Sequence, residues 1–248
     1  MRILIAALRG IWLAGVLAWA GVGVAQERNT VTLQVELSAS GSGKAVAQRK
    51  TRDLSNVVVW LKPLGSSATS AVEPAKQRPK LIQKNKTFEP HLVVVPVGST
   101  VDFPNHDPFF HNVFSVFDGK RFDLGLYEAG TTNSVRFDKP GISFLFCNIH
   151  PEMNAVVVAL DTPYFGTSNK AGAVSIPGVP AGRYELHVWY ERSSSESLRH
   201  LTRTLEVSSS NSDLGTIAVP ESQQPMAQHK NKYGQDYAPP PPDTYTPH

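Results

Sequence analysis

Cysteine is almost absent from this sequence. Cys147 is the single cysteine among 248 residues, so an intrachain disulfide is excluded and stability must come from a hydrophobic core. The 41% of hydrophobic residues is enough for such a core in one or two domains. The sequence also lacks a large net charge, because it has 24 basic and 21 acidic residues. This balance gives no support to binding of nucleic acid through a basic surface.

Long amphipathic helical patterns are missing as well. Instead, short alternating or apolar runs are separated by turn residues, among them 18 Gly and 19 Pro. Alternation with period two predicts half-buried strands, and short β-branched runs predict buried strands. The runs are 31–37, 57–61, 88–95, 100–103, 111–116, 131–137, 142–146, 155–160, 172–176, 183–190, 202–207 and 216–219. We therefore predict an all-β fold, with one β-sandwich followed by a second, smaller one.

The first 25 residues have the composition of an export signal. Arg2 and Arg9 flank its start, residues 11–24 are apolar apart from glycine, and small residues precede Gln26. Cleavage there leaves 22 basic against 21 acidic residues, because the signal holds two basic residues and no acidic one. The alternative is an uncleaved membrane anchor, since 3–25 is nearly long enough to span a bilayer. We predict a periplasmic or secreted protein, with no membrane insertion after cleavage.

Composition divides the remaining chain into three parts. Residues 26–161 are predicted to form the first sandwich, with a polar insertion around 62–82. Residues 162–220 are predicted to form the second. From 221 to 248 the periodicity is lost and prolines accumulate, which predicts a disordered tail.

The residues that carry chemistry follow the apolar run 142–146. Cys147, His150 and Met153 have the spacing C-x2-H-x2-M, which places a thiolate, an imidazole and a thioether on one connecting loop. A free thiol in an exported protein is open to oxidation, and binding to a metal protects it. One Cys with imidazole nitrogens and a weak Met is the donor set of a mononuclear copper site. Such a trigonal site needs one more nitrogen donor from elsewhere in the chain.

Two histidines upstream compete for that fourth place. His111 begins an apolar strand, so packing can fix its position, whereas His106 lies in a Pro-rich loop. We prefer His111 as the ligand and keep His106 as the alternative. If no metal is bound, both are ordinary loop histidines beside an aromatic cluster.

These stretches together resemble a known family. The sequence His-Asn-Val-Phe at 111–114, the strand and cysteine at 141–147 and the short loop to position 153 are similar to those of a cupredoxin, a blue-copper protein of the plastocyanin and amicyanin kind. The resemblance covers roughly 31–160, and the loop spacing is closer to amicyanin. The region is also similar to proteins described loosely as methylamine-utilization proteins. The resemblance implies a Greek-key β-sandwich that holds one type 1 copper.

The resemblance also implies the role of each site residue. His111 and His150 would supply imidazole nitrogens, Cys147 the thiolate and Met153 the long axial sulfur. Asn112 matches a family position that links the two ligand segments, and its backbone N–H is expected to bond the cysteine sulfur.

The implied function is single-electron transfer and not enzyme catalysis. In this family the exposed edge of the loop histidine, here His150, passes the electron. An apolar surface of Pro108, Phe109, Phe110 and Pro151 would dock an unidentified redox protein weakly. The alternative for Phe109 and Phe110 is packing in the core.

Other function classes stay open at this stage. The same ligands suit a copper-binding or copper-delivery protein, and a structural or adhesive double sandwich would leave them without a role. A Cys147–His150 nucleophile and base is less suited to one tight loop than a shared metal. The sequence has no His-x-His pair for a multicopper oxidase and no second cysteine for a dinuclear copper site. Residues 172–186 resemble a transthyretin-like regulatory module found beside carboxypeptidases, which would contact protein or glycan.

Overall fold

A computed structural model describes residues 28–39, 52–65, 72–116, 119–222 and 230–237. The all-β prediction is confirmed, because the described elements are strands apart from one short helix, α1 (Ser195–Arg199). The predicted export signal lies outside the described residues. Within the described ranges, no helix combines the length and the apolarity that a membrane crossing requires.

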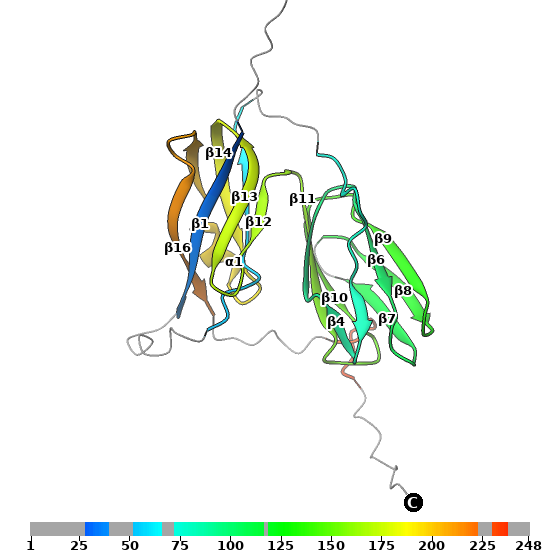
Figure 1. Ribbon diagram of the computed structural model, residues 1–248. Coiled ribbons are helices and arrows are strands. Elements are labelled where there is room, and N and C mark those ends of the chain that lie inside the picture. Colours follow the sequence, from blue (N-terminus) through cyan, green and yellow to red (C-terminus); the bar gives the residue numbers. More distant parts are fainter. Residues whose placement is uncertain (1–27, 40–51, 66–71, 117–118, 223–229, 238–248) are drawn as a thin grey trace, which may run out of the picture.

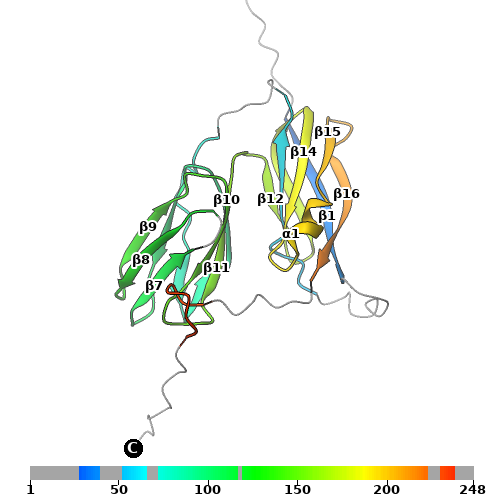
Figure 2. The same ribbon diagram turned by 180° about the vertical axis from the view of Figure 1, so that it is seen from behind.

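Two β-sandwiches lie side by side (Figure 1). The outer sandwich pairs a sheet of order β13-β1-β16 with a sheet of order β12-β2-β14-β15. Its strands are β1 (Arg28–Ala39), β2 (Val58–Pro63), β12 (Phe165–Thr167), β13 (Ala173–Pro180), β14 (Gly182–Trp189), β15 (Arg203–Val207) and β16 (Asp213–Glu221). Figure 2 shows α1 and β15 of this sandwich from behind.

The inserted sandwich takes all its strands from the chain between β2 and β12. One sheet has the order β5-β11-β10-β7-β8, and the facing strands form the pairs β3-β4 and β6-β9, which two isolated bridges connect. Its strands are β3 (Ile82–Lys84), β4 (Thr87–Glu89), β5 (Leu92–Pro96), β6 (Thr100–Pro104), β7 (His111–Ser115), β8 (Phe122–Tyr127), β9 (Thr132–Arg136), β10 (Gly141–Phe146) and β11 (Asn154–Leu160).

The burial of β11 explains why its sequence is a continuous apolar run. Val157 and Ala159 on one face belong to the core of the inserted sandwich. Val156, Val158 and Leu160 on the other face belong to the core of the outer sandwich. Because successive side chains of a strand point to opposite faces, a strand covered on both sides is apolar throughout. The two sandwiches therefore share a packed interface along β11.

The predicted division of the chain is wrong for its N-terminal strands. β1 pairs with β13 and β16, and β2 pairs with β12 and β14, so both strands belong to the outer sandwich and not to the first predicted domain. The inserted sandwich begins at the end of the polar stretch predicted as an insertion at 62–82, because Leu81 belongs to its core and β3 begins at Ile82. Residues 66–71 lie outside the described residues. Alternation predicted these strands correctly, but pairing partners more than 100 residues away leave no local signal.

The prediction of a disordered tail over 221–248 is wrong for residues 230–237. This segment forms a turn and hydrogen-bonds to the inserted sandwich. Residues 223–229 and 238–248, with the proline run, lie outside the described part of the chain. The expected likeness of 162–220 to a regulatory module stays a prediction.

Candidate metal centre

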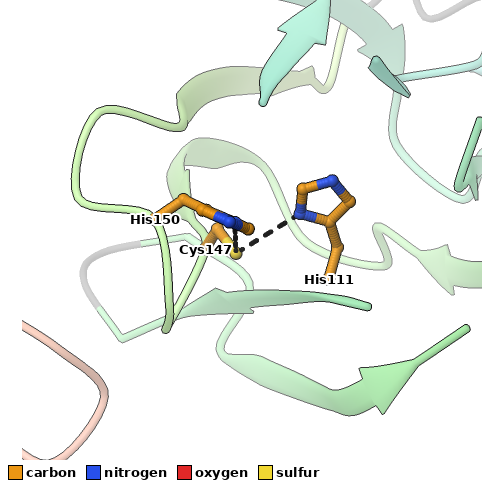
Figure 3. A group of neighbouring side chains, drawn as sticks. All are labelled: His111, Cys147 and His150. Carbon is orange, nitrogen blue, oxygen red and sulfur yellow. Dashed lines mark hydrogen bonds between the residues drawn. The ribbon is translucent and has the colours of Figure 1, made fainter. Parts of the chain in front are cut away.

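The structure brings three of the predicted ligands together at one end of the inserted sandwich. One ligand atom each from His111, Cys147 and His150 lies within 4.8 Å of the others. The Cys147 Sγ atom is 3.8 Å from Nδ1 of His111 and 3.5 Å from Nδ1 of His150, and Figure 3 shows both imidazoles turned toward the sulfur. Among the described residues this is the group of His, Cys, Asp and Glu side chains that could hold a metal ion.

Strand β7 and a buried carboxylate fix His111. The side chain is fully buried, because β7 lies between β10 and β8 in the sheet. Its Nε2 atom is 2.8 Å from Oδ2 of Asp107. A carboxylate accepts only, so Nε2 carries the proton and Nδ1 presents its lone pair to the sulfur. A carboxylate that orients a histidine in this way is common behind metal ligands.

Asp107 is itself held as an anion. Its oxygens accept hydrogen bonds from the backbone N–H groups of Asn85, at 2.6 Å, and Lys86, at 2.9 Å. Burial alone would raise the pKa of Asp107, but these bonds and the one from His111 hold that pKa below its usual value. We did not predict this role from the sequence; the signal available was an acidic residue four positions before the ligand.

The loop between β10 and β11 positions the other residues. Cys147 N–H donates to the Met153 carbonyl at 3.2 Å, and Met153 N–H donates to the His150 carbonyl at 3.1 Å. These bonds close a tight turn in which Cys147 and Met153 are fully buried and His150 is partly exposed. Cys147 and Met153 pack in the same hydrophobic cluster. Because the turn is short and its ends are fixed strands, the side chains of Cys147 and His150 come together.

The electrostatic environment of Cys147 suits a thiolate only when a cation is present. Burial raises the pKa of the Cys147 thiol, while the nearby backbone N–H groups of Asn112, Ile149 and His150 oppose that rise. The hydrogen bond expected from the Asn112 N–H to the sulfur stays a prediction. Burial, and then the neighbouring His111, lower the pKa of His150, which leaves it a neutral imidazole able to coordinate.

The spacing of these donors fits a single ion. A first-row metal bonds sulfur at about 2.3 Å and histidine nitrogen at about 2.0 Å, so angles of roughly 109–120° place the two donors about 3.5–3.8 Å apart. The observed sulfur–nitrogen separations of 3.5 and 3.8 Å lie in this range. The donor set, with one thiolate, two imidazoles and a buried thioether nearby in sequence, is the set that copper prefers.

The two candidate histidines behave differently. His106 is exposed and lies outside the group of donors, and its backbone N–H donates to the Gln83 carbonyl. His111 is in the group. The difference arises from strand pairing, because His111 opposes Tyr127 of β8 inside the sheet.

One aromatic side chain packs against both imidazoles. The Phe109 ring lies 5.2 Å from the ring of His111 and 5.7 Å from that of His150, so it packs against the site. Phe110, by contrast, is 55% exposed. Two residues absent from the predicted docking surface are also exposed, Leu126 at 60% and Ile149 at 44%. Sequence reasoning missed them because exposed apolar residues on a strand and a loop share no pattern.

Comparison with known proteins gives a limited result. No protein family model matches the chain, and no curated protein matches it. Among solved structures, a purple cupredoxin from Nitrosopumilus maritimus is 23% identical, with a TM-score of 0.30, over 33% of this chain and 99% of its own. A reduced mutant of amicyanin is 23% identical, with a TM-score of 0.32, over 41% of this chain and 98% of its own.

A copper-containing nitrite reductase from Thermus scotoductus SA-01 is also similar. It is 23% identical, with a TM-score of 0.34, over 51% of this chain but only 28% of the reductase. Likeness at this level carries no functional argument for the chain.

Proposed function

We propose that the protein is an exported carrier of single electrons that holds one type 1 copper ion through His111, Cys147, His150 and Met153. The observation that carries the proposal is the convergence of one buried thiolate and two imidazole nitrogens at separations of 3.5 and 3.8 Å. When bound, copper supplies the one-electron couple. The residues of the chain supply a fixed geometry, an environment without water, and an imidazole edge that is exposed to the solvent.

Fixed geometry matters because an electron moves fastest when few atoms move with it. His111 is held at its far nitrogen by Asp107, and the backbone bonds of Cys147 and Met153 close the ligand loop. Neither end of the site needs to rearrange when the charge of the ion changes by one. The burial of Cys147 also protects the thiolate from oxidation.

The route of the electron follows from exposure. Of the three clustered donors, only His150 reaches the surface. The exposed apolar side chains of Phe110, Leu126 and Ile149 come from segments that carry or adjoin the ligands. An apolar surface of this kind favours brief docking of a redox protein, and its small size favours fast release.

The test is the absorption spectrum of the copper(II)-loaded protein. A thiolate bound to copper(II) gives an intense band near the red end of the visible spectrum, so we expect a coloured protein. Cys147→Ser and His111→Ala should lose the band, whereas His106→Ala, a matched histidine outside the group, should keep it. A colourless copper(II) complex of the wild type would refute the proposal, and an unchanged Cys147→Ser spectrum would refute the ligand assignment.

Copper delivery is the competing function for the same ligands. Delivery requires exchange of the ion with a partner, yet His111 and Cys147 are fully buried. We therefore expect oxidation and reduction at an electrode to be much faster than loss of copper to a chelator. The opposite order of rates would favour delivery.

A further inference from the structure

The C-terminal segment 230–237 has no role in the electron carrier described so far. Figures 1 and 2 both show it, in red, against one end of the inserted sandwich, although its chain follows the last strand of the outer sandwich. It contains few apolar residues, so its position must be explained by hydrogen bonds. Those bonds converge on the two segments that carry the metal ligands.

The segment is folded on itself before it meets the site. The side chain of Asn231 accepts from the N–H groups of Tyr233, at 2.9 Å, and Gln235, at 3.0 Å. The Asn231 N–H donates to the Gln235 carbonyl at 2.8 Å. An asparagine that caps a turn in this way fixes the directions of the residues beside it. Lys232 and Tyr237 are thereby presented from one small, closed turn.

Two bonds from this turn reach the loop that holds Cys147 and His150. The Tyr237 hydroxyl donates to the Cys147 carbonyl at 2.8 Å, and the Lys232 N–H donates to Oδ1 of Asn148 at 2.9 Å. Both acceptors lie on the residues between β10 and His150. The backbone of the proposed thiolate ligand is thus bonded on one side by Met153 and on the other by Tyr237.

A further chain of bonds reaches the segment that carries His111. The ammonium group of Lys232 is 2.7 Å from Oδ2 of Asp123, whose other oxygen accepts from the Asn112 side chain at 2.7 Å. Asn112 follows His111 directly in strand β7. Lys232 therefore connects the two ligand segments through Asp123 and Asn148.

We propose that residues 230–237 form a C-terminal clamp that positions the copper ligands, with Tyr237 as the residue that acts on Cys147. The inference rests on the proposed function. The Tyr237 hydroxyl draws electron density from the cysteine peptide and holds the loop in its turn. Both effects favour copper(I), because a thiolate that donates less stabilises the reduced ion relative to the oxidised one. Partners behind metal ligands typically change metal affinity 10–100-fold when removed.

The experiment compares Tyr237→Phe with Tyr233→Phe in the full chain. Tyr233 lies in the same turn but is 70% exposed, and its ring lies 5.3 Å from the Lys232 ammonium. Its variant makes the same chemical change and keeps that ring. For Tyr237→Phe we expect an affinity for copper(I) about tenfold lower. If the copper(I) affinity falls tenfold and the copper(II) affinity stays the same, the reduction potential falls by about 59 mV. Tyr233→Phe should match the wild type in both measurements.

A metal-free readout keeps this result separate from the proposed function. In the metal-free Tyr237→Phe protein, the amide hydrogens of residues 147–153 should exchange faster than in the wild type. The amides of β11 should stay protected in both proteins. A wild type that lacks the charge-transfer band refutes the electron carrier. A coloured wild type whose Tyr237→Phe variant keeps its potential, its copper(I) affinity and its amide exchange refutes the clamp.

Discussion

The two sandwiches of this protein bury different kinds of residue. The core of the outer sandwich is aliphatic and aromatic, and the hydroxyl of its central Tyr184 is bonded to the Pro180 carbonyl. The inserted sandwich buries Asn105, Asp107 and His111 in addition to its apolar core. A buried polar group is unfavourable unless its partners are in place. The outer sandwich therefore has the composition of a scaffold, and the inserted one has the composition of a site.

The outer sandwich also packs against the two strands that carry the ligand loop. β11 contributes to both cores, and Phe144 of β10 contacts Trp189 of the outer sandwich at a ring distance of 6.4 Å. The ligand loop joins β10 to β11. The scaffold thus supports both strands from which the loop projects, although it lends no residue to the group of donors around Cys147.

The largest expected effect is a loss of stability that leaves the absorption spectrum unchanged. Leu186→Ala removes a fully buried side chain of the outer core and should lower the free energy of unfolding by about 3 kcal/mol. The charge-transfer band of the folded variant should not change. Chemical denaturation and absorption spectra measure the two quantities. Leu205→Ala, at a partly buried position, should cost less. Loss of the band in folded Leu186→Ala protein would contradict the division between scaffold and site.

The second largest effect should be on copper affinity instead of on stability. Asp107→Asn removes the charge behind His111 and should lower copper affinity about 10–100-fold, since the imidazole loses the partner that fixes its tautomer. Chelator competition measures the affinity. Asp138→Asn is the matched control, because that carboxylate pairs with Lys120 on the surface. Equal affinities of the two variants would show that Asp107 does not orient the ligand.

The smallest effect concerns the contact between the sandwiches. His91 of the inserted unit is 2.6 Å from the Glu191 carboxylate of the outer one, and this bond, opposed by burial, raises the pKa of His91. A raised folded-state pKa contributes stability that is fully present below the unfolded value of about 6.5 and lost as pH rises through the folded value.

Because the His91 side chain is 38% exposed, solvent screening keeps this contribution below about 1 kcal/mol. Unfolding measured from pH 5 to pH 9 should show the loss in the wild type, and His91→Gln should remove that step. An unchanged pH profile in His91→Gln would assign the dependence to other groups.

The sequence predicts the strands well where burial is regular. β1 has buried Val31, Leu33 and Val35 in alternation with polar residues, and it was expected within three residues of its bounds. It does not predict which sandwich a strand joins, because the partners of β1, β13 and β16, lie about 140 and about 180 residues away. β8 was missed, since Gly125 and the exposed Leu126 break its alternation.

The site was predictable to the extent that its ligands are close in sequence. Cys147, His150 and Met153 lie within seven residues, and the strand after His111 favoured that histidine over His106. Asp107 and Tyr237 were not predicted, because each acts through a hydrogen bond that only the folded chain brings about. A polar contact of this kind leaves neither periodicity nor spacing in the sequence.

The most direct test of the central claim is X-ray absorption at the copper edge of the loaded, full-length protein. The account predicts one close sulfur neighbour and two nitrogen neighbours in both oxidation states, with little change in their distances on reduction. In Cys147→Ser protein the close sulfur should be absent. A copper(II) ion surrounded by nitrogen and oxygen alone in the wild type would contradict the account.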